Sequence, residues 1–191
     1  MPQPNAAALS FLQTRRSRPA KTLAAPAPDA AALRDLLTIA ARTPDHGKLE
    51  PWRFIVLTRA ALPRFADSAR ALGEAQGRDP MDIVKAASQF ADSPLAVVVV
   101  ASPKPSPKVP RVEQLLSAGA VCLSLLNGAL AAGWGANWLT GWASHDRDFC
   151  ALMGLSDDET IAGIIHIGSE SSAPPERPRP DIDAITTWVE A

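Results

Sequence analysis

A run of cations around one hydroxyl is the first group of residues able to do chemistry, and it follows a helical pattern over residues 6–14. The run consists of Arg15, Arg16, Ser17 and Arg18. Guanidinium groups donate paired hydrogen bonds and a serine hydroxyl adds another donor, so these side chains match the oxygens of a phosphate group. Charges at a helix end also commonly lie in solvent. The run is therefore a candidate phosphate site, with a solvated charge run as the alternative.

A second cluster lies in the loop of residues 42–52, RTPDHGKLEPW, between a helical pattern and a strand pattern. Two prolines and a glycine constrain its backbone, and it carries Arg42, His46 and Lys48 within seven positions. We expect a binding role for this loop, although a single histidine is more often structural. Metal binding is not expected, because no second histidine or cysteine stands at ligand spacing.

The third cluster is residues 133–142, GWGANWLTGW, which hold three of the five tryptophans. Glycine permits close backbone approach and tryptophan offers planar contact area, which together suit a flat ring system. A strand whose tryptophans pack in the core is the alternative. Motifs of the Rossmann, P-loop and serine-hydrolase types do not occur, so those functions lose their main support. No pair of nucleophile and base is evident, and we assign no catalytic residue.

The charge balance of the 191-residue chain excludes some partners. Nineteen Lys+Arg against twenty Asp+Glu give a net charge of −1, so no basic excess is available for nucleic acid or for a membrane surface. Only 20% of the residues are charged while 47% are apolar, and part of the surface is therefore expected to be covered. The length favours one domain over residues 1–191.

The two cysteines, Cys122 and Cys150, have neither Cys-x-x-Cys spacing nor a His-rich neighbourhood. This argues against a zinc site and a disulfide scaffold, and it fits a reducing cytoplasm. The first residues lack the basic start and apolar core of a secretory signal. We therefore expect a cytoplasmic protein.

Strand and helix patterns alternate along the chain, which predicts an α+β or α/β fold. Three short β-branched runs have the composition of strands buried on both faces, and a fourth run is weaker. The strand patterns cover residues 53–58, 95–101, 161–168 and, more weakly, 134–139. Helical patterns cover residues 6–14, 29–41 with Asp29 as N-cap, 60–72, 81–89 and 146–153.

Residues 115–133 form a stretch of 19 residues without a charge. The length would suffice for a membrane span, and a small membrane-anchored protein is one alternative. Polar residues, three glycines and the lack of a basic C-terminal flank favour a helix buried in a core or between subunits. The Pro-rich segment 173–180 should run extended outside any helix.

The order of these clusters resembles the FMN-dependent nitroreductase family, in its minimal single-domain branch, over nearly the whole chain. No one of the matching motifs is specific alone, and their order and spacing carry the resemblance. They are Arg15-Arg16-Ser17, Arg42-x-Pro-Asp-His46 with Pro51-Trp52, the segment 108–119 with Glu113 and Gln114, Gly135-x-x-Trp138, and Ile167-Gly168 before the Pro/Arg-rich tail.

The resemblance implies a three-layer α+β fold with a central mixed, mainly antiparallel sheet flanked by helices. It also implies an obligate homodimer with the long helices at the interface and one FMN at each end of that interface. The C-terminal extension, residues 173–191, would wrap the partner subunit.

The resemblance further implies site residues for each part of the cofactors. Arg15, Arg16 and Ser17 would hold the FMN phosphate and ribityl chain or the pyrimidine edge, with Arg177 and Arg179 as additional candidates for the phosphate. Arg42 and His46 would come from the other subunit, and Trp138, Leu139 and Thr140 would line the isoalloxazine. The nicotinamide nucleotide would contact Gly128, Ala129, Leu130, Ala131, Ala132 and Gly133.

The implied activity is a ping-pong transfer in which NADH or NADPH gives a hydride to flavin N5 and a small acceptor, such as a nitroaromatic or a quinone, is then reduced. The alternative is a flavin-binding carrier or redox sensor without turnover.

Two departures from the family pattern bear on the acceptor. Glu50 stands where Asn or Gln is common and would discourage anionic substrates, and Leu139 stands where a polar residue often follows the tryptophan.

Overall fold

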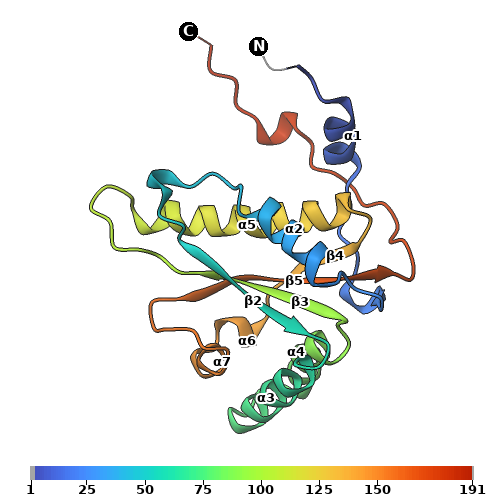
Figure 1. Cartoon of the computed structure of the whole chain (residues 1–191), viewed down its shortest axis with the longest axis vertical. Helices are drawn as coiled ribbons and strands as arrows, with labels where there is room; N and C mark the ends of the chain where they lie inside the picture. Colours follow the sequence, from blue (N-terminus) through green and yellow to red (C-terminus); the bar gives the residue numbers. More distant parts are fainter. Residues whose placement is uncertain (1–2, 191) are drawn as a thin grey trace.

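The longest strand, β5, organises a five-stranded sheet in the computed structural model, which describes residues 3–190 (Figure 1). β5 pairs with β1, β3 and β4, and β3 pairs with β2; all four pairings are antiparallel. The strands are β1 (Leu23–Ala24), β2 (Trp52–Thr58), β3 (Leu95–Ala101), β4 (Gly135–Leu139) and β5 (Thr160–Glu170).

Helices cover both faces of this sheet, which makes three layers (Figure 1). One apolar cluster joins the sheet to α2 and α5, and the other joins it to α3, α4, α6 and α7. The α-helices are α1 (Ala6–Thr14), α2 (Ala30–Ala40), α3 (Leu62–Ala75), α4 (Pro80–Ala91), α5 (Arg111–Ala131), α6 (Trp142–His145) and α7 (Arg147–Leu152). Short 3-10 turns are η1 (Ala20–Thr22), η2 (His46–Lys48) and η3 (Asp183–Ile185). The expected α+β class with a mainly antiparallel sheet is confirmed.

Strand β3 has the burial that its sequence predicts. All seven of its residues are buried, and successive side chains enter opposite clusters, with Val97 and Val99 in one and Val98 and Val100 in the other. The expected burial on both faces is wrong for β2, where only Leu57 is buried. β2 pairs with β3 alone among the described residues, so it is an edge strand and one side of it lacks the cover that a central strand has.

The long uncharged stretch forms most of α5, which begins at Arg111, before the predicted start. α5 is long and apolar enough to cross a membrane by length and composition alone. One face of it, which includes Val121, Cys122 and Leu125, is fully buried against the sheet and α2. The opposite face exposes apolar side chains, among them Leu123. α5 is thus a core helix in this fold, and it carries an uncovered apolar stripe.

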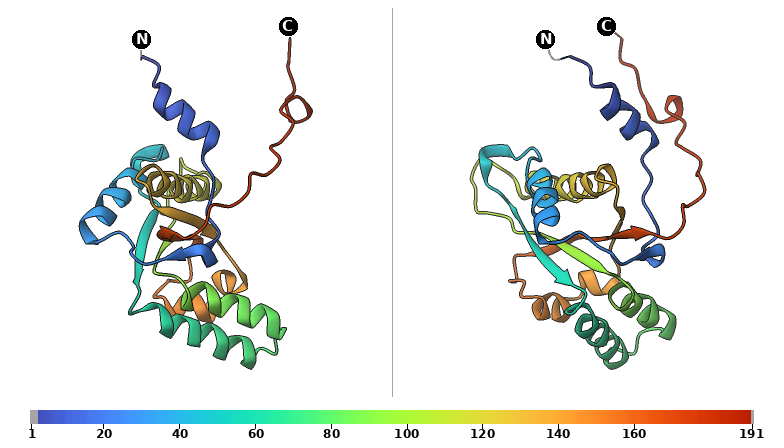
Figure 2. Two further views of the ribbon diagram at one scale, coloured as in Figure 1. Left: turned by 90° about the vertical axis from the view of Figure 1, so that its right-hand side faces the viewer. Right: turned by 45° about the vertical axis from the view of Figure 1, so that its right-hand side comes forward.

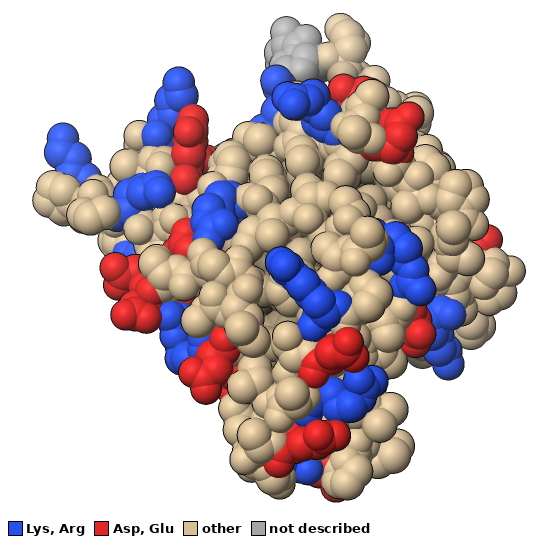
Figure 3. All heavy atoms as spheres, turned by 60° about the horizontal axis from the view of Figure 1, so that its bottom comes forward, with Lys and Arg blue, Asp and Glu red and all other residues tan. Residues whose placement is uncertain are grey.

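Both ends of the described chain project from this body on the same side (Figure 2). No residue of α1 is buried, and its Leu9 and Leu12 are exposed. The described residues after β5 form no α-helix, and residues 173–180 lie outside any helix, as predicted. It exposes apolar side chains up to Trp188, which is 81% exposed. By contrast, positive and negative side chains are interspersed over the face shown in Figure 3.

One buried histidine lies in the middle of β5. His166 is fully buried, and its Nδ1 lies 2.9 Å from the Ser93 hydroxyl oxygen. That hydroxyl donates its own proton to the carbonyl of Leu95, so Nδ1 donates to the Ser93 oxygen. Nε2 has no hydrogen-bond partner among residues 3–190. Burial lowers the pKa of His166 to about 4 from the model-peptide value of 6.5.

We expect His166 to make the fold sensitive to mild acid. Between about pH 6.5 and pH 4 the unfolded chain takes up a proton that the native chain does not, so the free energy of unfolding falls as the pH is lowered through this window. The full shift corresponds to about 3 kcal/mol. Urea unfolding at several pH values measures this loss.

The matched variant His166→Gln keeps an amide donor for Ser93 but has no titrating group, so its stability should depend less on pH in that window. Arg53 lowers the pKa of Glu159 to about 2, so the unfolded chain also protonates this carboxylate before the native chain does, toward the acid end of the window. That contribution is the same in both proteins, and the difference between their pH slopes therefore reports on His166. Equal pH slopes for the two proteins would show that another group is responsible.

Candidate functional site

Two segments far apart in the sequence meet in a cavity of about 400 Å³. One is the linker after α1, and the other is the C-terminal segment after β5. We call this cavity the arginine cradle. It is lined by Arg15, Arg16, Ser17, Arg177, Pro178, Arg179 and Pro180.

Hydrogen bonds inside the cradle leave two buried donors free. One terminal nitrogen of Arg15 donates to the Ser17 hydroxyl at 2.8 Å, and one of Arg16 donates to the carbonyl of Pro175 at 3.0 Å. The Nε atoms of Arg15 and Arg16 are buried and have no hydrogen-bond partner in the part of the chain that the structure describes. Buried donors are costly to leave unpaired, so an anion with several oxygens fits this arrangement.

The charges in the cradle also favour an anion. Burial is the largest cause that lowers the pKa of Arg15, and the neighbouring Arg179 and Arg16 lower it further. Guanidinium groups stay charged in proteins, so the lowered pKa reports repulsion and lost hydration. A phosphate group would relieve both.

Backbone pairing fixes the cradle beside β4. The amide of Arg18 donates to the carbonyl of Ala136 at 2.8 Å, and the side-chain amide of Asn137 donates to the carbonyl of Arg18 at 2.7 Å. The Arg18 guanidinium also pairs with Glu170 at 3.1 Å. The first and third sequence clusters are therefore neighbours in the fold.

At the end of β4 lies a second cavity, of about 280 Å³, which we call the lysine cavity. Leu139 and Thr140 line it, as do Lys21 and Lys85, which the sequence did not single out. The rest of its lining is Ala20, Ser88, Gln89, Asp92 and Ser93. Only long-range contacts between the α4 region, the linker and β4 bring these residues together, so no local pattern could have indicated them.

Trp138, the remaining predicted ring contact, packs closely against β5. A Cβ atom added at Gly163 would lie 2.0 Å from the indole nitrogen of Trp138, so only glycine allows the ring to approach this closely. Trp138 is half-buried against the α5 side of the sheet. The alternative interpretation, in which the tryptophan packs in the core, therefore also holds in part.

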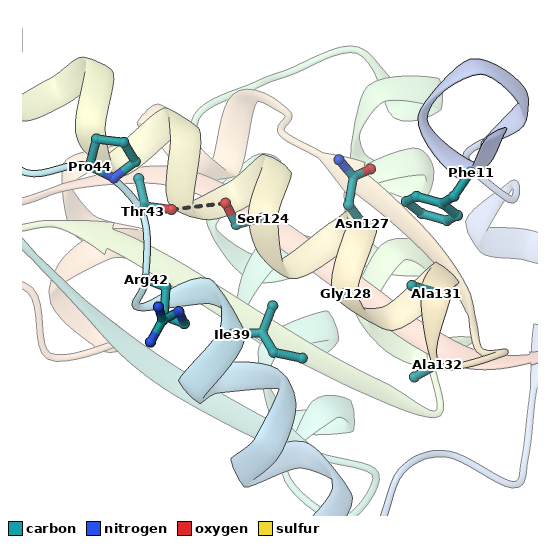
Figure 4. A pocket seen from close by; sticks show the side chains of 10 residues that line it. All are labelled: Phe11, Ile39, Arg42, Thr43, Pro44, Ser124, Asn127, Gly128, Ala131 and Ala132. Atoms are coloured by element: carbon teal, nitrogen blue, oxygen red, sulfur yellow. Dashed lines mark hydrogen bonds between the residues drawn. The ribbon is translucent and has the colours of Figure 1, made fainter. Parts of the chain in front are cut away.

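A third cavity, of about 670 Å³, lies between α1, the end of α2 and the outer face of α5, and we call it the α5 cavity (Figure 4). Thr43 and Ser124 bridge it with a hydroxyl contact of 2.9 Å. It brings Arg42 together with part of the predicted nicotinamide segment. Its lining is Phe11, Ile39, Arg42, Thr43, Pro44, Ser124, Asn127, Gly128, Ala131 and Ala132.

The loop of residues 42–52 is fastened to α5 by polar contacts. Ser117 donates to the carbonyl of Pro44 at 2.9 Å and accepts from the Trp52 indole at 3.2 Å. His46 contacts the Glu113 carboxylate at 2.6 Å. The backbone of this loop is also unusual, because Lys48 and Glu50 have φ values of 53° and 50°, a region that non-glycine residues rarely adopt.

These positions divide the predicted site residues into separate groups within one chain. Arg15, Arg16 and Ser17 meet in the arginine cradle, together with the two tail arginines that were only additional candidates. Leu139 and Thr140 line the lysine cavity. Arg42 and three of the α5 residues line the α5 cavity, whereas His46 pairs with Glu113 and Ala129 is buried in the core.

Comparison with known proteins agrees with this architecture. The model of the Nitroreductase family matches residues 12–169. YdjA of Escherichia coli K12, provisionally named an NAD(P)H nitroreductase, is 33% identical over 162 residues, which cover 85% of this chain and 87% of YdjA.

Solved structures give the same fold. A nitroreductase-like family protein of Bacillus cereus superposes with a TM-score of 0.83 at 23% identity, with all of both chains covered. A nitroreductase of Bacteroides fragilis with bound FMN has a TM-score of 0.72 at 17% identity, covering 98% of this chain and 100% of that one. The fold is therefore nitroreductase-like, and the chain belongs to the Nitroreductase family.

Proposed function

We propose that this protein binds FMN and acts as an oxidoreductase that takes a hydride from NADH or NADPH and reduces a small acceptor such as a nitroaromatic or a quinone. The arginine cradle carries the proposal, because two buried guanidinium Nε atoms there lack hydrogen-bond partners among the described residues and a phosphate would supply acceptors for them. The FMN named with the Bacteroides fragilis structure and the NAD(P)H named with YdjA support the choice of cofactor and reductant.

Each part of the site would then bind a part of the cofactor. Arg15, Arg16 and Ser17, joined by the tail arginines, would bind the phosphate. Leu139 and Thr140 would line the ring, since the cradle and β4 are neighbours through the Arg18 contacts. FMN when bound supplies the hydride-accepting and hydride-donating atom, N5.

The charges around the lysine cavity suit that chemistry. A reduced flavin carries extra negative charge on its pyrimidine side, and preorganised cations stabilise developing charge of this kind. Lys21 and Lys85 provide two cations at the cavity that Leu139 and Thr140 line, while Asp92 offsets part of their charge. The chain's contribution is binding, orientation and charge, and we assign no side chain as acid or base.

We further propose that the active unit is a homodimer. The exposed apolar stripe of α5 lies beside the α5 cavity, and α1 adds exposed leucines. Covering these surfaces with a second copy would remove apolar area from water on both. Arg42 and His46 would then reach the flavin of the other subunit, which explains why one chain alone keeps them apart from the arginine cradle.

The C-terminal extension, residues 173–191, is proposed to wrap that second subunit. Its described part exposes Ile182, Ile185 and Trp188, and β2 offers an unpaired sheet edge on the other copy.

We also propose a cytoplasmic location, because Cys122 and Cys150 are free and buried. Burial raises the pKa of Cys122 to about 12, so this thiol is unreactive at neutral pH.

The first expectation is that purified protein is yellow and that NADH or NADPH bleaches it under anaerobic conditions. Visible spectra before and after addition measure this, and steady-state oxidation of the nicotinamide with a quinone measures turnover. Bleaching without turnover would favour a carrier or redox sensor. Protein that gains no flavin absorbance after incubation with FMN and desalting would contradict the proposal.

Arg15→Ala should weaken FMN binding by about 1.5–3 kcal/mol, as expected when a charge-assisted hydrogen bond is lost. Quenching of FMN fluorescence on binding gives the dissociation constant. Arg70→Ala is the matched control, because Arg70 is an exposed arginine on α3 whose one ion pair among the described residues is with Asp67. Equal FMN affinity for wild type and Arg15→Ala would remove Arg15 from the site.

Leu123→Glu should convert the dimer to a monomer, because it places a charge in the apolar stripe of α5. Sedimentation velocity measures the mass, and FMN affinity should fall at least about tenfold if Arg42 and His46 contact the flavin across the interface, each lost charged contact being worth about 1.5–3 kcal/mol. Leu152→Glu on α7 is the control, since Leu152 is also exposed but lies on the opposite side of the sheet. A wild-type monomer, or a dimeric Leu123→Glu protein, would overturn the interface.

A further inference from the structure

One carboxylate lies at the arginine cradle. An oxygen of Glu176 is 2.9 Å from a terminal nitrogen of Arg179 and 3.8 Å from Nε of Arg16. It therefore bridges the two segments that form the cradle. Among the described ion pairs, it is the only acidic side chain joined to the cradle arginines.

Glu176 balances charge without satisfying the buried donors. Its 3.8 Å separation from the Arg16 Nε is too long for a hydrogen bond, so that atom and the Arg15 Nε both stay unpaired. The backbone amide of Arg177 is the largest cause that lowers the pKa of Glu176, followed among the lowering causes by Arg179 and Arg16. The carboxylate is thus negative at neutral pH.

The carboxylate is also free to leave. The Glu176 side chain is 66% exposed, so it can turn into solvent without losing buried contacts. The segment before it is held by other bonds: Ser171 bonds the carbonyl of Thr22 through both its amide and its hydroxyl, and the carbonyl of Pro175 accepts from Arg16. The path of the tail to the cradle does not depend on Glu176.

We propose that Glu176 is an internal counter-ion of the arginine cradle that competes with the phosphate group of the ligand. This inference rests on the proposed binding of FMN. The carboxylate lessens the repulsion among the arginines while no phosphate is bound, and it repels a phosphate that enters. Glu176 therefore weakens binding of phosphorylated ligands selectively, and it leaves a flavin without phosphate unaffected.

The variant Glu176→Gln tests this, because it keeps the size and hydrogen-bonding capacity of the side chain and removes its charge. The full-length protein is stripped of bound flavin and titrated with FMN and, separately, with riboflavin. We expect about three- to fivefold tighter binding of FMN at low salt, a size typical of one exposed ion pair, and unchanged binding of riboflavin. Added salt should shrink the gain.

Glu74→Gln is the matched control, since Glu74 is an exposed glutamate on α3 and its substitution changes the net charge equally. Wild type that binds FMN, with Glu176→Gln binding it equally or more weakly, would overturn the counter-ion role and leave the proposed function standing. Tighter binding of riboflavin by Glu176→Gln, or tighter binding of FMN by Glu74→Gln, would also overturn the counter-ion role. Wild type that binds neither flavin would instead overturn the proposed function, and this inference with it.

Discussion

Repulsion between guanidinium groups held close together is the constraint on which the candidate site depends. Folding brings Arg15 and Arg16 next to the two tail arginines, although like charges at short range oppose it. Backbone hydrogen bonds between the linker and β4, and between the tail and the turn at η1, hold the segments in place. The close arginines therefore lower the stability of the fold, and they keep the site electropositive before any ligand binds. Preorganised anion sites gain affinity in this way.

Helix α5 is the second feature on which the candidate site depends, and its two faces have different partners. Its buried face completes the apolar cluster beneath α2, and its outer face forms one wall of the α5 cavity. A small residue near the end of the helix allows close packing on α2: a Cβ atom added at Gly128 would lie 3.3 Å from Ile39. A single helix therefore couples the packing of the core to the shape of the surface on which the proposed subunit interface depends.

Sequence reasoning is most direct where the signal is contiguous. The β3 run is confirmed as a strand buried on both faces. The Arg15–Ser17 run lines one cavity, and its role in binding phosphate stays a prediction. Sequence reasoning failed for β2, because an apolar run does not reveal whether a strand has one neighbour or two. Lys85 was missed for a related reason: a lysine on an amphipathic helix looks solvated until the fold brings β4 beside it. Family resemblance supplied the roles of the remaining residues, which spacing alone could not.

Gly163 shows how far the demands of a binding surface reach into the scaffold. It has no side chain and lines none of the three cavities described above, yet its missing methyl group sets the height at which the Trp138 indole rests on the sheet. A larger residue there would lift the ring and displace the end of β4 that follows it. The side chains that position 163 can accept are therefore set by a tryptophan on the neighbouring strand, and a larger residue there requires a smaller one at position 138.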